Sequence, residues 1–262
     1  MTLVVRDEAD ILALQLRYHR QRGVDFFLVL DHASQDATPE ILKHYERLGW
    51  LRWFRTDALR RDQGRWVTAL ARRACLEHQA DWVINNDADE FWWCDTQTDL
   101  KAVLARVPLP HRLMYAPRTN FWAPNQENWW QQTYRQVKAH NFLREPLSGK
   151  ICHRAEADIV VHHGNHSVHP MHEGDIWPEQ PLEIFHFPVR SWPQFESKVR
   201  NGGRSWAANA SLSPAMGRGK KYLYQRYLTG ELKGVYKDWQ WVAQEENRVR
   251  DTRFLEFVEG MG

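Results

Sequence analysis

Residues 81–90 read Asp-Trp-Val-Ile-Asn-Asn-Asp-Ala-Asp-Glu, an apolar run that ends in a cluster of acidic side chains. The run predicts a short strand over residues 82–85, followed by carboxylates at Asp87 and Asp89. Side chains two positions apart at the end of a strand point to the same side, so both carboxylates can approach one ion. Hard divalent cations prefer such oxygen ligands. Acidic pairs in turns are more often solvated or capping groups, so the place of the run in the fold decides its meaning.

On either side of this run, apolar segments alternate with segments of helical length. The expected strands are residues 2–6, 24–30, 50–54, 82–85 and 112–116. The expected helices are residues 8–22, 38–48 and 65–78, and a short one that Thr98 caps. Strands that alternate with helices of about 10 to 15 residues predict an α/β fold, with a mixed, mostly parallel central sheet and helices on both faces.

Polar clusters follow four of the expected strands. They are residues 6–8, 31–36, 57–63 and 87–90. In sheets of this kind, ligands bind outside the carboxyl ends of the strands. Four clusters at one edge therefore predict a single binding site that includes the acidic run.

The composition excludes several classes of protein. A net charge of +2 over 262 residues does not favour a nucleic-acid partner. Three widely spaced cysteines form neither a disulfide framework nor a zinc motif, and they favour a reducing compartment. No apolar segment approaches the ~18 residues of a membrane helix, and no secretory signal is visible. We therefore expect a cytoplasmic protein whose contact with a membrane, if it has one, is peripheral.

Separated motifs resemble a known family. They are Val-Arg-Asp-Glu-Ala-Asp at 5–10, Leu-Asp-His-Ala-Ser-Gln-Asp-Ala-Thr at 30–38, the acidic run extended to Phe91, and Phe-His-Phe-Pro-Val-Arg-Ser at 185–191. In this order, over roughly residues 3 to 203, they resemble the family-2 type of glycosyltransferase, and most closely its "DxDEF" branch.

The resemblance implies a Rossmann-like, A-type glycosyltransferase fold. It implies transfer of a sugar from a nucleotide-diphosphate donor to a hydroxyl of a glycan or lipid-linked acceptor, usually with inversion, and with Mn²⁺ or Mg²⁺ held by Asp87 and Asp89. The chain would then divide into a nucleotide-sugar-binding half (1–116), an acceptor-binding half of the same domain (117–217) and a helical, basic and aromatic extension (218–262).

Matching positions give the expected donor-binding residues. Arg6 and Glu8 would border the nucleotide pocket, and Asp31 would contact the base or ribose. Asp36 would stabilise that loop, or equally would be a turn residue that starts the next helix. Asp7 stands where the family usually has Asn. The remaining candidates for the donor are Gln63, Lys150, Arg190 and Lys198.

The rest of the active site is less determined. His186 is a candidate third metal ligand, or equally a core histidine. A general base has to take the proton of the acceptor hydroxyl. The candidates are Glu127, His166, Glu173 and Asp175, of which Glu173 is preferred. The candidates for stacking on sugars are Trp122, Trp129, Trp130 and Trp177.

Histidines recur between residues 162 and 172 at a spacing that suggests zinc, but Gly164 and Pro170 argue against one helical face, so a loop bordering the acceptor is expected. Two other functions stay open. One is a metal-dependent nucleotidyltransferase or phosphohydrolase, although a Walker-type loop is missing. The other is a non-catalytic carbohydrate-binding module, which would leave the acidic pair unexplained. The basic stretch 218–227 is either a solvated helix or a contact for an anionic or lipid-linked acceptor.

Overall fold

The computed structural model describes the chain except residues 59–61, 123–127, 138–144, 208–216, 242–247 and 262. It separates into two compact units. The first contains residues 1–58, 62–118 and 148–184, and the second contains residues 59–61, 119–147 and 185–262.

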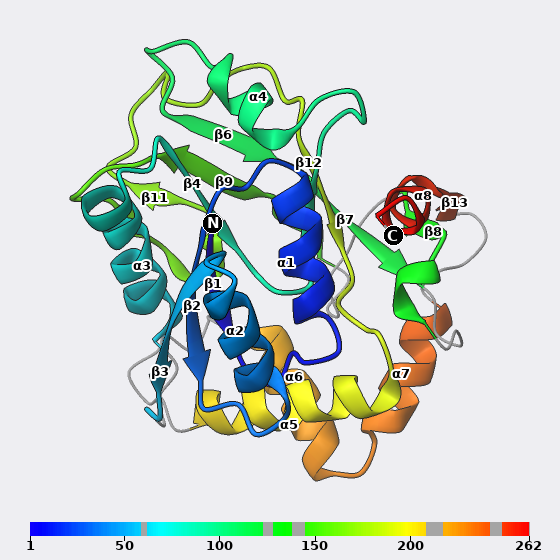
Figure 1. The fold of residues 1–262 in the computed structure, drawn as a ribbon. Coiled ribbons are helices and arrows are strands. Elements are labelled where there is room, and N and C mark those ends of the chain that lie inside the picture. Colours follow the sequence, from blue (N-terminus) through cyan, green and yellow to red (C-terminus); the bar gives the residue numbers. More distant parts are fainter. Residues whose placement is uncertain (59–61, 123–127, 138–144, 208–216, 242–247, 262) are drawn as a thin grey trace. The chain divides into compact units, whose positions relative to one another are not determined.

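The first unit is built on a six-stranded sheet (Figure 1). Its order is β3 (Leu51–Thr56), β2 (Phe27–His32), β1 (Thr2–Val5), β4 (Trp82–Asn86), β9 (Lys150–Arg154) and β6 (Leu113–Ala116). The first four strands are parallel, and β9 lies antiparallel between β4 and β6. This confirms the predicted mixed, mostly parallel sheet.

Helices cover both faces of this sheet (Figure 1). They are α1 (Leu12–Gln21), α2 (Thr38–Arg47), α3 (Gln63–His78) and the short α4 (Leu100–Ala105). The connections through α1 and α2 step outward from β1 to β3, whereas α3 returns to β4. Because such crossovers are right-handed, α3 lies on the opposite face. It packs Val67 and Leu70 against Val4, Leu28 and Val83 of the strands. Strands covered on both faces need continuous apolar runs, which is the pattern that the sequence shows.

Three details of the first unit differ from the expectation. Asp99, not Thr98, caps α4, because its carboxylate accepts from the Ala102 N–H at 2.6 Å. The first helix begins at Leu12 rather than residue 8, and the Glu8 N–H donates to the Thr38 hydroxyl at 3.0 Å. The sequence reading missed β5 (Glu90–Trp93), β9 and the hairpin of β10 (Val160–Val161) and β11 (Val168–His169).

The second unit combines four neighbouring strands with helices. The strands follow the order β13 (Arg248–Arg250), β8 (Tyr134–Gln136), β7 (Arg118–Trp122) and β12 (Glu183–His186), the last two beginning in the first unit. The helices are α5 (Trp192–Ala207), α6 (Arg218–Leu228), α7 (Leu232–Trp241), α8 (Arg253–Glu259) and the 3₁₀ turn η1 (Trp129–Gln131). One core joins α5, α6 and α7 through Phe195, Val199, Leu223, Leu232 and Tyr236.

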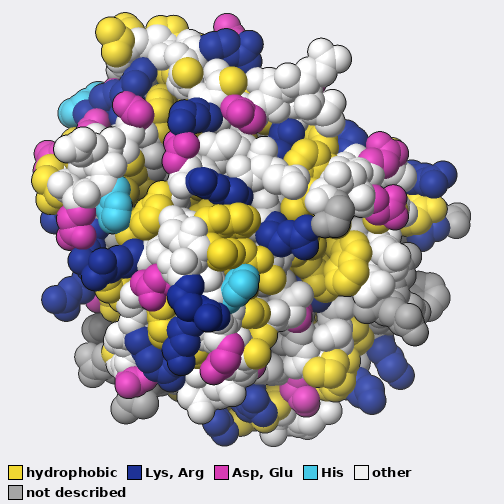
Figure 2. Space-filling model, viewed as in Figure 1, with side chains coloured by type: hydrophobic (Ala, Val, Ile, Leu, Met, Phe, Trp, Pro, Cys, Tyr) yellow, Lys and Arg dark blue, Asp and Glu magenta, His cyan; other side chains and the backbone are white. Residues whose placement is uncertain are grey.

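Lys and Arg side chains are interspersed with Asp and Glu over the face shown in Figure 2, in line with the small net charge. Within the described ranges, no helix has the length and apolar character needed to cross a membrane.

Candidate functional site

The acidic run forms a tight turn at the carboxyl end of β4. The turn closes where the Glu90 N–H donates to the Asp87 carbonyl at 3.1 Å. The Asn86 side chain fixes it from inside the protein, since its amide donates to the Glu90 carbonyl at 2.9 Å and accepts from the Trp92 indole at 3.0 Å. Asp89 is almost fully buried, whereas the Asp87 side chain keeps 28% of its surface exposed. Asn86 is therefore a supporting residue of the turn.

A buried lysine neutralises this turn. The Nζ atom of Lys150, the first residue of β9, lies 2.7 Å from Asp87 Oδ2 and 3.2 Å from Glu90 Oε2. It also donates to the Gly164 carbonyl at 2.7 Å. Lys150 was predicted to contact a donor diphosphate, but its ammonium group is directed at oxygen atoms of the protein itself.

Two further side chains complete this charged cluster. Arg118 donates to Glu90 Oε1 at 2.8 Å, so the fully buried Glu90 carboxylate lies between two cations. Gln63, at the start of α3, donates to Asp87 Oδ1 at 3.2 Å. The sequence reading placed Gln63 in the site but missed Arg118. The signal was available, because Arg118 lies only two residues after the end of the expected strand 112–116.

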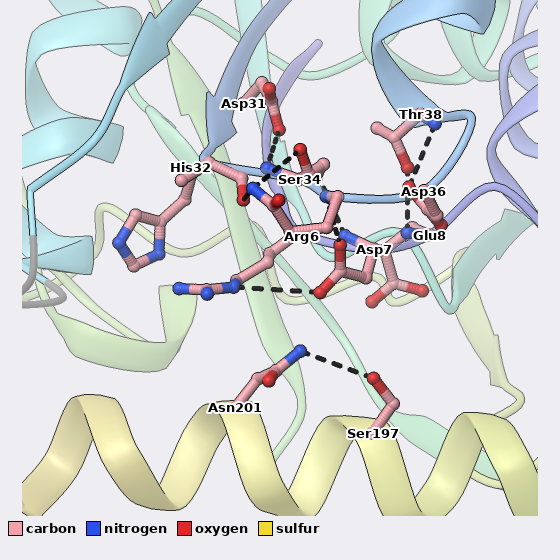
Figure 3. Close-up of polar contacts among 12 residues, drawn as sticks. Arg6, Asp7, Glu8, Asp31, His32, Ser34, Asp36, Thr38, Ser197 and Asn201 are labelled. Carbon is pink, nitrogen blue, oxygen red and sulfur yellow. Dashed lines mark hydrogen bonds and ion pairs between the residues drawn. The ribbon is translucent and has the colours of Figure 1, made fainter.

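The loop after β2 is fixed by Asp31. Its buried carboxylate accepts from the Ser34 N–H at 3.1 Å through Oδ1 (Figure 3). Its Oδ2 accepts from Arg55 at 2.8 Å. The Asp31 carboxylate therefore holds the loop directly through Ser34 and also through Arg55, which donates to the Ser34 carbonyl. Arg55 was not among the predicted residues.

The loop after β1 is joined to the same segment (Figure 3). The Asp7 N–H donates to the Ser34 hydroxyl at 2.9 Å, and the Asp7 carboxylate accepts from the Gln35 N–H at 2.7 Å. Arg6 lies beside it, with Nε 3.8 Å from Asp7 Oδ2. Asp7 adopts a φ of 54°, a region in which Asn and Asp are the commonest residues after Gly. An aspartate in place of the usual asparagine therefore keeps this loop geometry.

Asp36 performs both of the roles considered for it. Its Oδ1 accepts from the Thr38 N–H at the start of α2, and its Oδ2 accepts from the Ala9 N–H, each at 2.9 Å (Figure 3). It is a turn residue that starts the helix and also a link between the two loops. The backbone N–H of Glu8 joins the same two loops, because it donates to the Thr38 hydroxyl.

His166 lies at this edge of the sheet, in the loop between the 3₁₀ turn η2 (His163–Asn165) and β11. Its Nδ1 donates to the Gly149 carbonyl at 2.7 Å, which leaves Nε2 as the basic nitrogen. Burial, and secondarily the charge of Lys150, lower the pKa of His166, so the ring is neutral near pH 7. In the part of the chain that the structure describes, no three His, Cys, Asp or Glu side chains form a metal-binding group, so the histidine-rich segment makes no zinc site there.

Two of the predicted bases, Glu173 and Asp175, lie elsewhere. The Asp175 carbonyl accepts from the Leu113 N–H at 2.9 Å, where β6 begins. Through β9, Leu113 is level with Val83 near the start of β4, whereas Asp87 follows the end of that strand. The structure therefore places these carboxylates at the opposite edge of the sheet from the acidic turn. Trp177, which is buried, belongs to the same region.

Other candidates belong to the second unit. The Nδ1 of His186 is hydrogen-bonded to the Asn120 side-chain oxygen at 2.7 Å, which directs Nε2 outward from that bond. Arg190 is buried and donates to the Phe187 carbonyl at 3.4 Å, and Lys198 is exposed on α5. The same helix carries the hydrogen bond between Asn201 and Ser197 drawn in Figure 3.

The tryptophan candidates differ in their surroundings. Trp129 is buried against Phe187 and Phe254, so it is a core residue, and Trp130 packs edge-on against it. Glu127 and the side chain of Trp122 fall outside the described residues.

A mixed sheet with connected polar loops and a charged acidic turn at one carboxyl edge is typical of an α/β protein that binds a ligand at that edge. Residues 2–205 match the model of glycosyltransferase family 92. The chain therefore belongs to glycosyltransferase family 92 and is a glycosyltransferase. This confirms the class of enzyme expected from the motifs. The family-2 type and its "DxDEF" branch are not confirmed.

Solved structures give weaker likenesses. S. aureus TarS 1-349 is 14% identical, with 87% of this chain and 69% of that chain covered and a TM-score of 0.43. The structure of its complex with UDP-GlcNAc is 13% identical, with 87% of this chain and 70% of that chain covered and a TM-score of 0.42. A putative glucose-1-phosphate thymidylyltransferase from Bacillus anthracis is 9% identical, with 88% of this chain and 83% of that chain covered and a TM-score of 0.30. Likenesses at this level add no argument to the family assignment. A comparison with curated proteins gives no match.

Proposed function

We propose that this glycosyltransferase uses a nucleotide-diphosphate sugar as donor, transfers the sugar with inversion to a hydroxyl of a glycan or lipid-linked acceptor, and depends on Mn²⁺ or Mg²⁺. The observation that supports this most is the acidic turn at the carboxyl end of β4, joined by Lys150 to the loop that carries His166. Sugar transfer is favoured over nucleotidyl transfer, and over a non-catalytic carbohydrate-binding module, because the family is one of glycosyltransferases.

We propose that Asp87 and Asp89 hold the divalent cation. Their carboxylates would supply oxygen ligands, and Mg²⁺ commonly takes only one or two carboxylates, with substrate phosphates and water as its other ligands. Such a cation would neutralise the charge that develops on the leaving diphosphate. His186 is kept as a proposed further ligand, because a hydrogen bond at one ring nitrogen is typical of metal-binding histidines.

The loops after β1 and β2 would receive the nucleoside. The backbone of this region is held by Asp7, Asp31 and Asp36, so its shape is set before the donor arrives. Arg6 and Glu8 belong to the loop after β1, and we propose that they contact the nucleotide. Arg190 and Lys198 are retained as proposed partners of the diphosphate.

We propose His166 as the general base. The acceptor oxygen bonds to the anomeric carbon while the bond from that carbon to the diphosphate oxygen breaks, and the hydroxyl proton passes to His166 Nε2. A neutral ring with Nδ1 fixed by the Gly149 carbonyl is prepared for this transfer. Glu173 and Asp175 lie at the opposite edge of the sheet, which removes the reason for preferring them. The cytoplasmic location and a peripheral membrane contact stay predictions.

Thermal denaturation with a panel of nucleotide sugars, with and without Mn²⁺, tests the donor and the metal together. A bound donor raises the melting temperature by mass action. Asp89→Asn should lose the Mn²⁺-dependent part of that rise, whereas Asp25→Asn, at an exposed ion pair with Lys101, should keep it. A wild-type protein that no nucleotide sugar stabilises in Mn²⁺ would refute the proposal.

Transfer rates measured against pH test the base. His166→Gln should lower the rate by about 10²-fold or more. His162→Gln is the matched control, because His162 is an exposed histidine of the same loop, bonded to the Ser167 hydroxyl at 2.8 Å. Equal rates for the two variants would contradict the assignment.

A further inference from the structure

The side chain of Lys150 is almost completely enclosed, with 1% of its surface exposed. Its ammonium group contacts carboxylate oxygens of Asp87 and Glu90 and the carbonyl of Gly164, at 2.7, 3.2 and 2.7 Å. A charge so far from water is tolerated only when it is paired and hydrogen-bonded. These contacts are therefore part of the folded structure rather than an incidental surface pair.

The backbone beside Lys150 gives this ammonium group little freedom. A Cβ atom added at Gly149 would lie 2.3 Å from the Ala116 carbonyl, so β9 runs directly against β6 at this point. The Gly149 N–H donates to the Tyr115 hydroxyl at 3.0 Å, and the Gly149 carbonyl accepts a hydrogen bond from His166 Nδ1 at 2.7 Å. The chain is thus fixed at Gly149, directly before the lysine, and after it by the pairing of Ile151 with Tyr115, so Nζ stays beside the acidic turn.

We propose that Lys150 is a positioning residue, a built-in cation that compensates Asp87 and Glu90 in the free protein, so that a divalent cation binds tightly only together with the diphosphate of the donor. The inference rests on the proposed function in assuming that the acidic turn receives a cation and a nucleotide diphosphate.

Coulomb's law gives the reason. An ammonium group 2.7 Å from Asp87 Oδ2 repels a divalent cation that approaches the same carboxylate. The diphosphate adds negative charge and further oxygen ligands, which offset this repulsion. Through the Gly164 carbonyl, Lys150 also ties the acidic turn to the loop of His166, so one side chain orders both halves of the site.

Isothermal titration with Mn²⁺ measures the effect directly. Wild-type protein should bind Mn²⁺ weakly alone and much more tightly with uridine or guanosine diphosphate present. In Lys150→Met, affinity for Mn²⁺ alone should rise at least about tenfold, and the enhancement by the nucleotide should fall by a similar factor. A purely structural lysine would lower the melting temperature and leave this enhancement unchanged. Lys101→Met, which removes an exposed lysine 2.9 Å from Asp25, should change neither.

The outcomes separate the two proposals. If neither nucleoside diphosphate enhances Mn²⁺ binding to the wild type, the proposed function fails. If enhancement occurs but a folded Lys150→Met binds Mn²⁺ as the wild type does, only the inference on Lys150 fails. Lys150→Gln, which keeps an N–H donor without the charge, replaces Lys150→Met if that variant does not fold. If neither folds, the wild type decides, since tight Mn²⁺ binding without diphosphate overturns the inference.

Discussion

Glu90 offers the sharpest test of how the acidic turn is held. Its carboxylate is fully buried and lies 2.8 Å from Arg118 and 3.2 Å from Lys150, whose side chains keep 12% and 1% of their surface exposed. Removing one partner of a buried ion pair leaves a charge without compensation in a medium of low polarity, which costs about 3 to 5 kcal/mol. Glu90→Gln keeps the shape and removes the charge. We expect Glu90→Gln to lower the free energy of unfolding by about 3 kcal/mol. The lower end of the range applies because Lys150 still has Asp87 as an ion-pair partner.

Urea-induced unfolding followed by circular dichroism measures this loss. The matched control is Glu77→Gln, because Glu77 pairs with Arg73 at the same 2.8 Å but on the surface of α3. Exposed pairs contribute about 0.2 to 1 kcal/mol, so this variant should change little. In an Arg118→Met background, Glu90→Gln should cost clearly less than it does alone. A loss below about 1 kcal/mol for Glu90→Gln, or strict additivity with Arg118→Met, would refute the buried charge cluster.

Three further predictions concern stability. Gly164→Ala should destabilise more than Gly174→Ala in thermal denaturation: both have positive φ, but only at Gly164 would a Cβ meet another group, His166 at 2.7 Å. Burial lowers the pKa of His19 to about 3 and the pKa of His153 to about 4. As the pH falls below about 6.5, these histidines therefore take up protons in the unfolded chain but not in the folded chain. Stability should then fall from pH 6.5 to 5 by about 3 kcal/mol in all, whereas a flat profile would contradict neutral burial. Asp36→Ala should cost about 1 to 2 kcal/mol in urea unfolding, because two backbone N–H groups lose their acceptor.

Much of the fold was predictable because it is encoded locally. The apolar runs of β1, β2, β3 and β4, and the helices between them, follow from periodicity over a few residues each. The parallel part of the sheet then follows from chain connection rules. Strands that depend on distant pairing were missed, and β9 is the main example, since it is inserted antiparallel between β4 and β6.

The sequence by itself determined that several polar loops and the acidic run share one edge of the sheet. Asp87 and Asp89 follow a recognisable strand, and the polar loops containing Asp7, Asp31 and Asp36 follow others, so their common edge could be inferred without coordinates. These residues owe their places to the strand that precedes them in the chain, and that relation can be read along the sequence.

Only the tertiary structure decided which side chains meet at that edge. The β9 register places Lys150 beside Asp87 and Glu90, Arg118 reaches Glu90 from the start of β7, and His166 rather than Glu173 shares this edge. The physical reason is that charges compensate one another across strands far apart in the chain. Register and burial set those distances, and spacing along the sequence carries no record of them.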